Sequence, residues 1–106
     1  MKKRIVVTSL SMVLFTSTCL LAKDFTGSIK IGIFDSETKA MEQIKVPIIP
    51  AIQAAKAAVP GQVVKAKVDE EDSYLVYEVK ILQTNGKKKE VFVDPITGKV
   101  LKIKDD

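Results

Sequence analysis

The sequence predicts an α+β fold, with one helix packed on a three- to four-stranded antiparallel meander sheet. Three observations predict it. Residues 51–59 are rich in alanine and place apolar side chains at helical spacing. Residues 64–103 contain short segments in which apolar and polar side chains alternate, as in strands with one buried face. Polar turns, among them Asn85-Gly86, separate these segments and favour hairpin connections.

The predicted helix needs the sheet. Pro50 lies where the first turn of a helix tolerates proline, and Pro60-Gly61 ends the helix. A helix of about ten residues is marginal in water, so it must pack its apolar face on a flat surface. That face consists of Ile48, Ile52, Ala55 and Val59, with Gln53 and Lys56 on the other side. Before it, residues 44–48 are apolar and interrupted by Pro47, which predicts an edge strand or an extended lead-in.

The predicted strands give the sheet one apolar face for the helix and one solvated face. The apolar positions are Val64, Ala66 and Val68, then Leu75, Tyr77, Val79 and Ile81, then Val91 and Val93, and finally Val100, Leu101 and Ile103. The solvated face carries Lys65, Lys67, Glu78, Lys80 and Glu90. Turns are expected at residues 69–73, at Asn85-Gly86, where both residues accept positive φ, and at 94–98, where Gly98 supplies a left-handed position.

Residues 23–43 form a leader segment of less regular pattern. Ile29, Ile31 and Ile33 alternate with other residues, which predicts a short strand. Asp35 or Ser36 then caps a short helical turn that runs through Ala40, Met41 and Ile44. The alternative is a loosely packed leader onto the domain of residues 44–106.

Residues 1–22 have the pattern of a secretory signal peptide. Lys2, Lys3 and Arg4 precede an uncharged run, and cleavage after Ala22 predicts an exported protein, periplasmic or extracellular. An uncleaved anchor is the alternative, although six Ser and Thr residues make the run a poor membrane span. Cys19 lies in this run without the small residues of a lipoprotein signal before it, so we expect it to be discarded with the signal.

Signal removal also changes the charge. The chain has 17 Lys and Arg against 13 Asp and Glu, but residues 23–106 have 14 against 13. The remaining net charge of +1 supports no general affinity for polyanions, and because export separates the protein from nucleic acid, we expect no nucleic-acid partner.

Few catalytic arrangements are open to this sequence. It contains no histidine, and its one cysteine lies in the predicted signal, so Ser-His-Asp and Cys-His arrangements are excluded. The usual zinc ligands are missing as well. A Ser-Lys pair stays formally open through Ser28, Ser36 and Ser73, but nothing singles out any of them. We expect no enzyme, no catalytic residue, no metal and no cofactor.

Four further features have a functional and a structural interpretation. The acidic run 69–72 lacks the spacing of a calcium loop and is expected to be a solvated turn. Lys87-Lys88-Lys89 could contact anionic lipid or an acidic partner, but its charges would equally guard a sheet edge. Tyr77 is expected in the core. Asp94 is expected to bond backbone N–H groups of its own turn.

Four segments together resemble the PepSY family. Ala51–Gly61 is similar to the helix and Pro-Gly stop of PepSY domains, and Tyr74–Ile81 to their central strand. Val91–Asp94 and Thr97–Leu101 resemble the closing strand and turn, so the likeness covers residues 44–104. One departure is Ile49-Pro50 where the family usually has a Ser, Thr or Asp cap, which leaves the helix start open.

The resemblance implies an exported, non-catalytic module that binds another exported or envelope protein. PepSY domains occur in the propeptides of thermolysin-type metallopeptidases, so an inhibitor or regulator of a peptidase is implied. The alternative is an accessory domain that senses a small ligand or an envelope condition for a membrane protein. A third hypothesis is a structural domain that acts by self-association through free strand edges.

Overall fold

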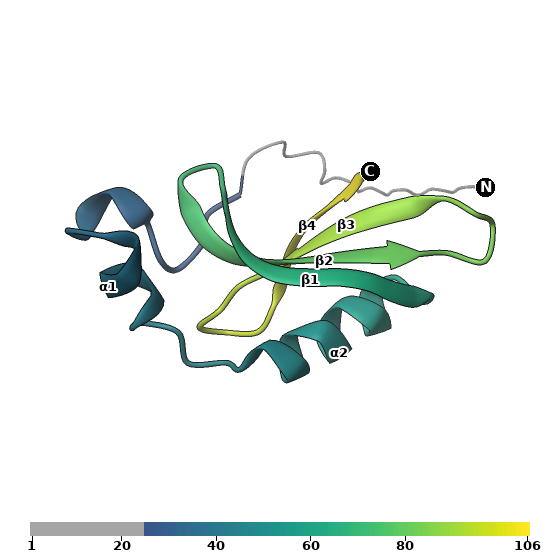
Figure 1. Ribbon diagram of the computed structural model, residues 1–106, viewed down its shortest axis with the longest axis horizontal. Helices are drawn as coiled ribbons and strands as arrows, with labels where there is room; N and C mark the ends of the chain where they lie inside the picture. Colours follow the sequence, from purple (N-terminus) through teal and green to yellow (C-terminus); the bar gives the residue numbers. More distant parts are fainter. Residues whose placement is uncertain (1–24) are drawn as a thin grey trace, which may run out of the picture.

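The computed structural model describes residues 25–106, in which one helix lies across one face of a four-stranded antiparallel sheet (Figure 1). The strands β1 (Gln62–Glu71), β2 (Tyr74–Leu82), β3 (Lys88–Val93) and β4 (Val100–Asp105) follow each other across the sheet in chain order. The main helix is α2 (Ile48–Ala58), preceded by a 3₁₀ turn η2 (Ile31–Ile33) and the short α1 (Glu37–Met41). The predicted α+β fold is confirmed, whereas the predicted signal peptide lies outside the described residues.

The start of α2 is set by two prolines. The helix begins at Ile48, three residues before the alanine-rich segment, with Pro47 as its N-cap and Pro50 in its first turn. The N–H groups of a first turn have no intrahelical partner, so a proline costs no hydrogen bond there. Residues 44–47 are thus an extended lead-in, and the alternative of an edge strand is wrong.

The face that α2 turns to the sheet is made of small side chains. Ala51 and Ala55 are fully buried and Val59 nearly so, while Ile48 and Ile52 are half-buried at the margin. Small residues let the helix backbone approach β2 and β3, where Val79 and Val91 are also fully buried. At the far end, Gly61 lies so close to β2 that an added Cβ would come within 2.5 Å of the Leu82 carbonyl oxygen.

A β-bulge changes the side-chain pattern of β1. The register with β2 shifts between Val63 and Lys65, so Val63 joins the core beside Ala66, whereas Val64 turns out to solvent and is 47% exposed. The expectation that Val64 faces the helix is therefore wrong. The extra residue of a bulge breaks the strict period of two that the prediction assumed.

The two hairpin turns differ from the prediction, the first in its length and the second in the backbone angle of Asn85. The acidic run continues β1 as far as Glu71, and the turn is only Asp72 and Ser73, both at positive φ (53° and 75°). In the next hairpin, Gly86 has a φ of 85° but Asn85 does not have positive φ. Asn85 instead accepts the Lys87 N–H on its side-chain oxygen at 2.9 Å.

The leader packs on the sheet and is not loosely attached. Ile29 and Ala40 are buried with Leu75 of β2 in a second apolar cluster. The Leu75 N–H donates to the Ile29 carbonyl at 2.9 Å, and the Ile31 N–H donates to the Ser73 carbonyl at 3.0 Å. This is a single bridge followed by a 3₁₀ turn, so the predicted strand over Ile29–Ile33 is wrong. Of the two predicted caps, Asp35 and Ser36, it is Ser36 that caps the short helix, which ends at Met41 and does not continue to Ile44 as predicted.

Candidate functional site

Asp94 joins the leader to the last turn of the sheet. It is 1% exposed, and its Oδ1 accepts the Ser28 N–H at 2.9 Å while Oδ2 accepts the Ser28 hydroxyl at 2.8 Å. Oδ2 also accepts the N–H groups of Ile96 (3.1 Å) and Thr97 (2.9 Å) and the Thr97 hydroxyl (3.1 Å). We call these residues the Asp94 junction. The prediction that Asp94 serves its own turn is confirmed, but its second role, across 66 residues to Ser28, has no signal in the sequence.

The charge of Asp94 is stabilised by these donors. Burial alone would raise the pKa of this carboxyl, but the hydrogen bonds from Thr97 and Ser28 outweigh burial and hold the pKa below its ordinary value of 3.8. A carboxylate that accepts several N–H and O–H bonds is a structural anchor and is not poised to take up a proton near neutral pH.

The face of the sheet opposite α2 carries most of the charged side chains of the four strands, and we call it the charged face. Its charged residues are Lys65, Lys67, Asp69, Glu71, Glu78, Lys80, Glu90, Lys102 and Lys104. Ion pairs cross the strands: Lys67 Nζ lies 3.7 Å from Glu78, and Lys80 Nζ lies 3.6 Å from Glu90. Lys104 Nζ lies 3.4 Å from Glu71.

The charged face is less solvated than the sequence suggested. Glu78 is only 7% exposed, and Val76 and Phe92 of the same face are buried. Lys104 Nζ lies 5.3 Å from the centroid of the Phe92 ring, so a long side chain covers an aromatic one. The prediction of a solvated Glu78 is therefore wrong, because neighbouring lysines and glutamates lie over the sheet instead of extending into water.

The burial of Glu78 affects its protonation. Burial raises the pKa of Glu78, and a hydrogen bond with Asp69 and the charge of Glu90 raise it further, against the charge of Lys67. The pKa of Asp69 is lowered, chiefly because the Glu70 N–H donates to its carboxylate at 2.8 Å. These carboxylates lie among lysines, and within residues 25–106 no three potential ligands are arranged to hold a metal ion.

The other predicted features have structural roles. Tyr77 is 3% exposed and its hydroxyl donates to the Val46 carbonyl at 2.6 Å, so its place in the core is confirmed. Ser28 donates to Asp94, Ser36 accepts the Lys39 N–H, and Ser73 occupies the hairpin turn. The structure thus uses the three serines in caps, turns and the Asp94 junction.

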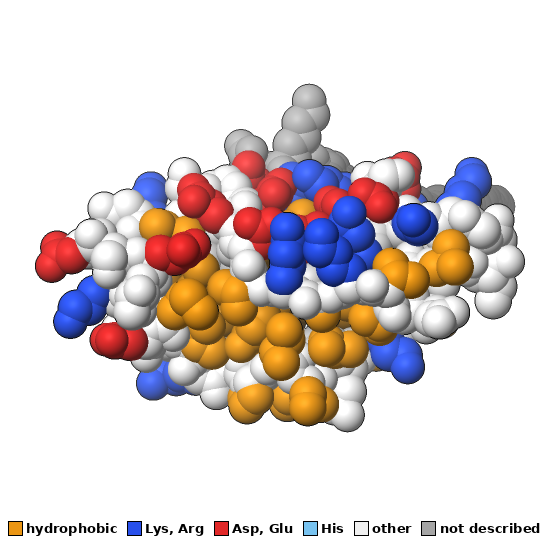
Figure 2. Space-filling view, viewed as in Figure 1, with side chains coloured by type: hydrophobic (Ala, Val, Ile, Leu, Met, Phe, Trp, Pro, Cys, Tyr) orange, Lys and Arg blue, Asp and Glu red, His pale blue; other side chains and the backbone are white. Residues whose placement is uncertain are grey.

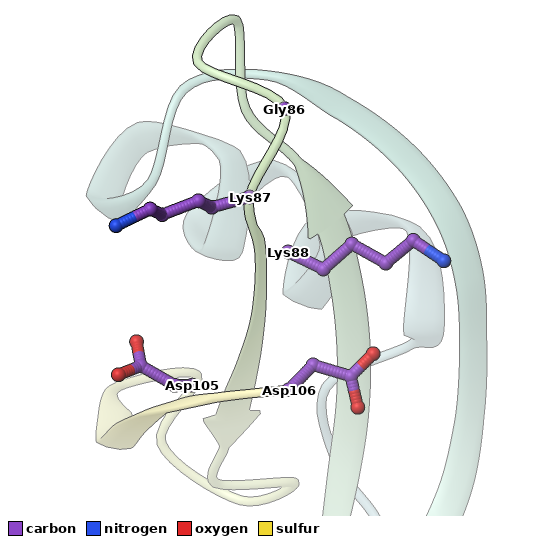
Figure 3. A pocket seen from close by; sticks show the side chains of 5 residues that line it. All are labelled: Gly86, Lys87, Lys88, Asp105 and Asp106. Carbon is purple, nitrogen blue, oxygen red and sulfur yellow. The ribbon is translucent and has the colours of Figure 1, made fainter.

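The three consecutive lysines do not form one cationic surface. Lys89 pairs with Asp105, whereas Lys87 and Lys88 extend in opposite directions beside an open hollow of about 470 Å³ (Figure 3). Asp105 and Asp106 line the same hollow. Because the two aspartates lie across the hollow from the two lysines and offset their charge, this surface offers no concentrated charge to lipid or to an acidic partner.

The comparison with protein families found a match. The family model described as peptidase propeptide and YPEB domain, PepSY, matches residues 51–104. The chain belongs to the PepSY family. A search of curated proteins and a search of solved structures gave no match. The PepSY match covers α2 from its fourth residue through nearly all of β4, and the leader with Ser28 lies outside it.

The PepSY sheet of this protein leaves two edges open. β1 and β4 are the outer strands, and no residue in the described part of the chain forms a strand beside either. The α2 start departs from the family pattern, since no side chain caps it. No helix among residues 25–106 is long and apolar enough to cross a membrane. The candidate functional surfaces of this PepSY domain are therefore its two open edges and its charged face.

Proposed function

We propose that this protein is an exported, non-catalytic module that binds another exported or envelope protein and regulates it, with a peptidase as the leading partner class. The family match carries the proposal, because its description names peptidase propeptides and it spans nearly all of the helix-on-sheet unit. The absence of histidine from the sequence also supports a role other than acid–base catalysis.

The open sheet edges support a binding mode. Edge strands present unpaired N–H and C=O groups, and an extended segment of a partner can add to them as a further strand. β4 is short, and its Ile103, on the face of the sheet that α2 covers, is still 43% exposed. Backbone pairing gives affinity in such complexes, and an exposed apolar side chain gives selectivity.

The charged face is the weaker candidate. All of its lysines and carboxylates except Lys65 are already paired within the sheet, for example Lys104 with Glu71 and Lys80 with Glu90. A partner would have to break these pairs and remove their charges from water. The free-energy cost of that desolvation is about as large as the gain from new ion pairs. The sensing alternative needs a pocket between helix and sheet, and the fully buried Ala51, Ala55 and Val79 fill that interface.

Affinity capture tests the proposal. The protein, produced from its full sequence with a C-terminal tag, is used to capture partners from the envelope and secreted fractions of its own organism. An Ile103→Pro variant removes a backbone donor from β4, with Ile103→Val as the matched control. Retention of a peptidase that the protein inhibits in a steady-state assay, and that Ile103→Pro no longer inhibits, is the expected result.

Other outcomes count against the proposal. If a retained peptidase keeps its full activity in a saturating excess of the protein, regulation of peptidases is wrong. If no exported protein is retained above the level of an untagged control, binding of a protein partner is wrong.

A further inference from the structure

The outer edge of β1 has the geometry of an unfilled strand position. The turn at Asp72-Ser73 is closed by the pair Glu71–Tyr74, so alternate residues of β1 direct their backbone groups toward β2. Ala66, Val68 and Glu70 direct theirs to the open edge. The Glu70 N–H confirms this direction, because it donates to the neighbouring Asp69 carboxylate at 2.8 Å and not to β2.

The charges of β1 are divided between its two halves. On the charged face, Lys65 and Lys67 come first, and Asp69 and Glu71 follow. Figure 2 shows a basic group and an acidic group side by side above an apolar band that follows β1 and α2. Lysines on an edge strand usually repel a second strand, but a strand with this pattern is complementary to itself when reversed.

We propose that β1 pairs antiparallel with β1 of a second copy, about a two-fold axis that passes Val68. In this register Lys65 faces Glu71 of the second copy, and Lys67 faces its Asp69. The symmetry repeats both pairs, so the interface has the same contacts on each side. Two four-stranded sheets then continue into one.

The charges select this register and this direction. A shift of two residues either way keeps the faces aligned but places Lys67 against Lys67, or Asp69 against Asp69. A parallel pairing in register places every charge against itself. Like charges directly opposite each other are destabilising, whereas opposite charges stabilise a cross-strand pair. The pattern therefore favours a closed pair over open-ended stacking of strands.

Apolar side chains beside the edge support the same contact. On the helix side, the Val68 side chains of the two copies meet at the axis. In a single copy, Val68 is half-buried. Val64 is 47% exposed on β1, and Ile49 is 65% exposed on α2. A second copy brings a second apolar band to this surface and removes part of both from water.

This inference concerns β1 alone and does not depend on the proposed function. It leaves β4 as the open edge for a regulated partner. The purified protein alone decides it, whereas the capture experiment decides the proposed function, so either one can fail without the other.

Sedimentation over a concentration series tests the pairing. The protein is expressed from its full sequence with Cys19→Ser, so that no native thiol can cross-link two copies, and is purified in the form that cells release. We expect a monomer–dimer equilibrium. Glu70→Pro removes an N–H from the open edge while leaving the β1–β2 ladder, and should abolish the dimer, whereas Glu70→Gln should retain it. Lys65 forms no ion pair with a described residue; Lys65→Glu would face Glu71 and should weaken the dimer about tenfold. Lys39→Glu on α1 is the control of equal charge change.

A disulfide tests the register directly. Val68 lies on the two-fold axis, where facing Cα atoms are about 5.5 Å apart, within the range of a disulfide. Val68→Cys should therefore cross-link two copies under mild oxidation, and Val64→Cys should not. A monomer at every concentration up to about 1 mM would overturn the proposal. A dimer that Glu70→Pro and Lys65→Glu leave unchanged would overturn it as well. The proposal would also be wrong if the protein stayed monomeric and an added extended peptide protected the β1 amides from hydrogen exchange, because the edge would then bind a different strand.

Discussion

The Asp94 junction makes the strongest prediction about stability. In Asp94→Asn, one oxygen is retained and the other is replaced by an NH₂ group. If the oxygen takes the Oδ2 position, it keeps the bonds from Ile96, Thr97 and the Ser28 hydroxyl. The NH₂ group then meets the Ser28 N–H across 2.9 Å, donor against donor.

The magnitude follows from that single lost contact. A hydrogen bond to a charged group contributes about 1.5–3 kcal/mol, and a buried donor without an acceptor adds to the loss. We expect Asp94→Asn to lower the free energy of unfolding by about 2–3 kcal/mol. Asp94→Ala removes all five bonds and should cost about 4 kcal/mol. Urea unfolding at pH 7 measures both values.

The pH dependence provides a second readout. Because the pKa of Asp94 lies below its ordinary value of 3.8 in the folded state, its contribution to stability is present above that value. The contribution is lost as the pH falls through the folded pKa. Asp94→Asn should lack this part of the acid destabilisation, so wild type and variant should converge at low pH.

A double-mutant cycle separates the two roles of Asp94. Ser28→Ala removes the hydroxyl that donates to Oδ2, and its effect should be smaller in the Asp94→Ala background, which has no acceptor for that hydroxyl, than in the wild type. Asp35→Asn, at an exposed position of the leader, is the matched control and should change stability by less than about 0.5 kcal/mol. An Asp94→Asn variant as stable as Asp35→Asn would refute the role given to the junction.

Three further predictions concern other contacts. Gly61→Ala should destabilise the fold by about 2–3 kcal/mol in urea unfolding, because the added Cβ would approach the Leu82 carbonyl oxygen to 2.5 Å. Tyr77→Phe should cost about 1 kcal/mol, because the bond to the Val46 carbonyl is lost. For Glu78, whose pKa is raised in the folded state, stability is lost as the pH rises through that folded pKa. Glu78→Gln should therefore gain stability relative to wild type from pH 4.5 upward, as measured by urea unfolding over a pH series.

Each of these changes has a control. Gly32→Ala adds a Cβ with no atom within 4 Å, so it should have little effect, and equal effects at both glycines would contradict the steric argument. Tyr74→Phe removes a hydroxyl from the same strand, and a loss as large as at Tyr77 would contradict the hydrogen-bond argument. For Glu78, a stability difference independent of pH would contradict the role of its protonation.

The sequence predicted those parts of the fold whose causes are local. Alanine content and Pro60-Gly61 located the end of α2, and alternation located β2 and β3. Errors arose where a local rule met a tertiary constraint. Val64 alternates in phase with Ala66, but the bulge that turns it outward is a property of the pairing with β2. Ile29 alternates like a strand residue, but only one bridge forms.

By itself, the sequence determined the fold class and the family, because periodicity, capping and turn preferences act over a few residues. The tertiary structure alone decided which groups meet across long separations. It placed Ser28 on Asp94, buried Glu78 among lysines and left β1 as an open edge with opposite charges in its two halves. The physical reason is that such contacts depend on register and on burial by distant residues, and neither leaves a periodic trace in the sequence.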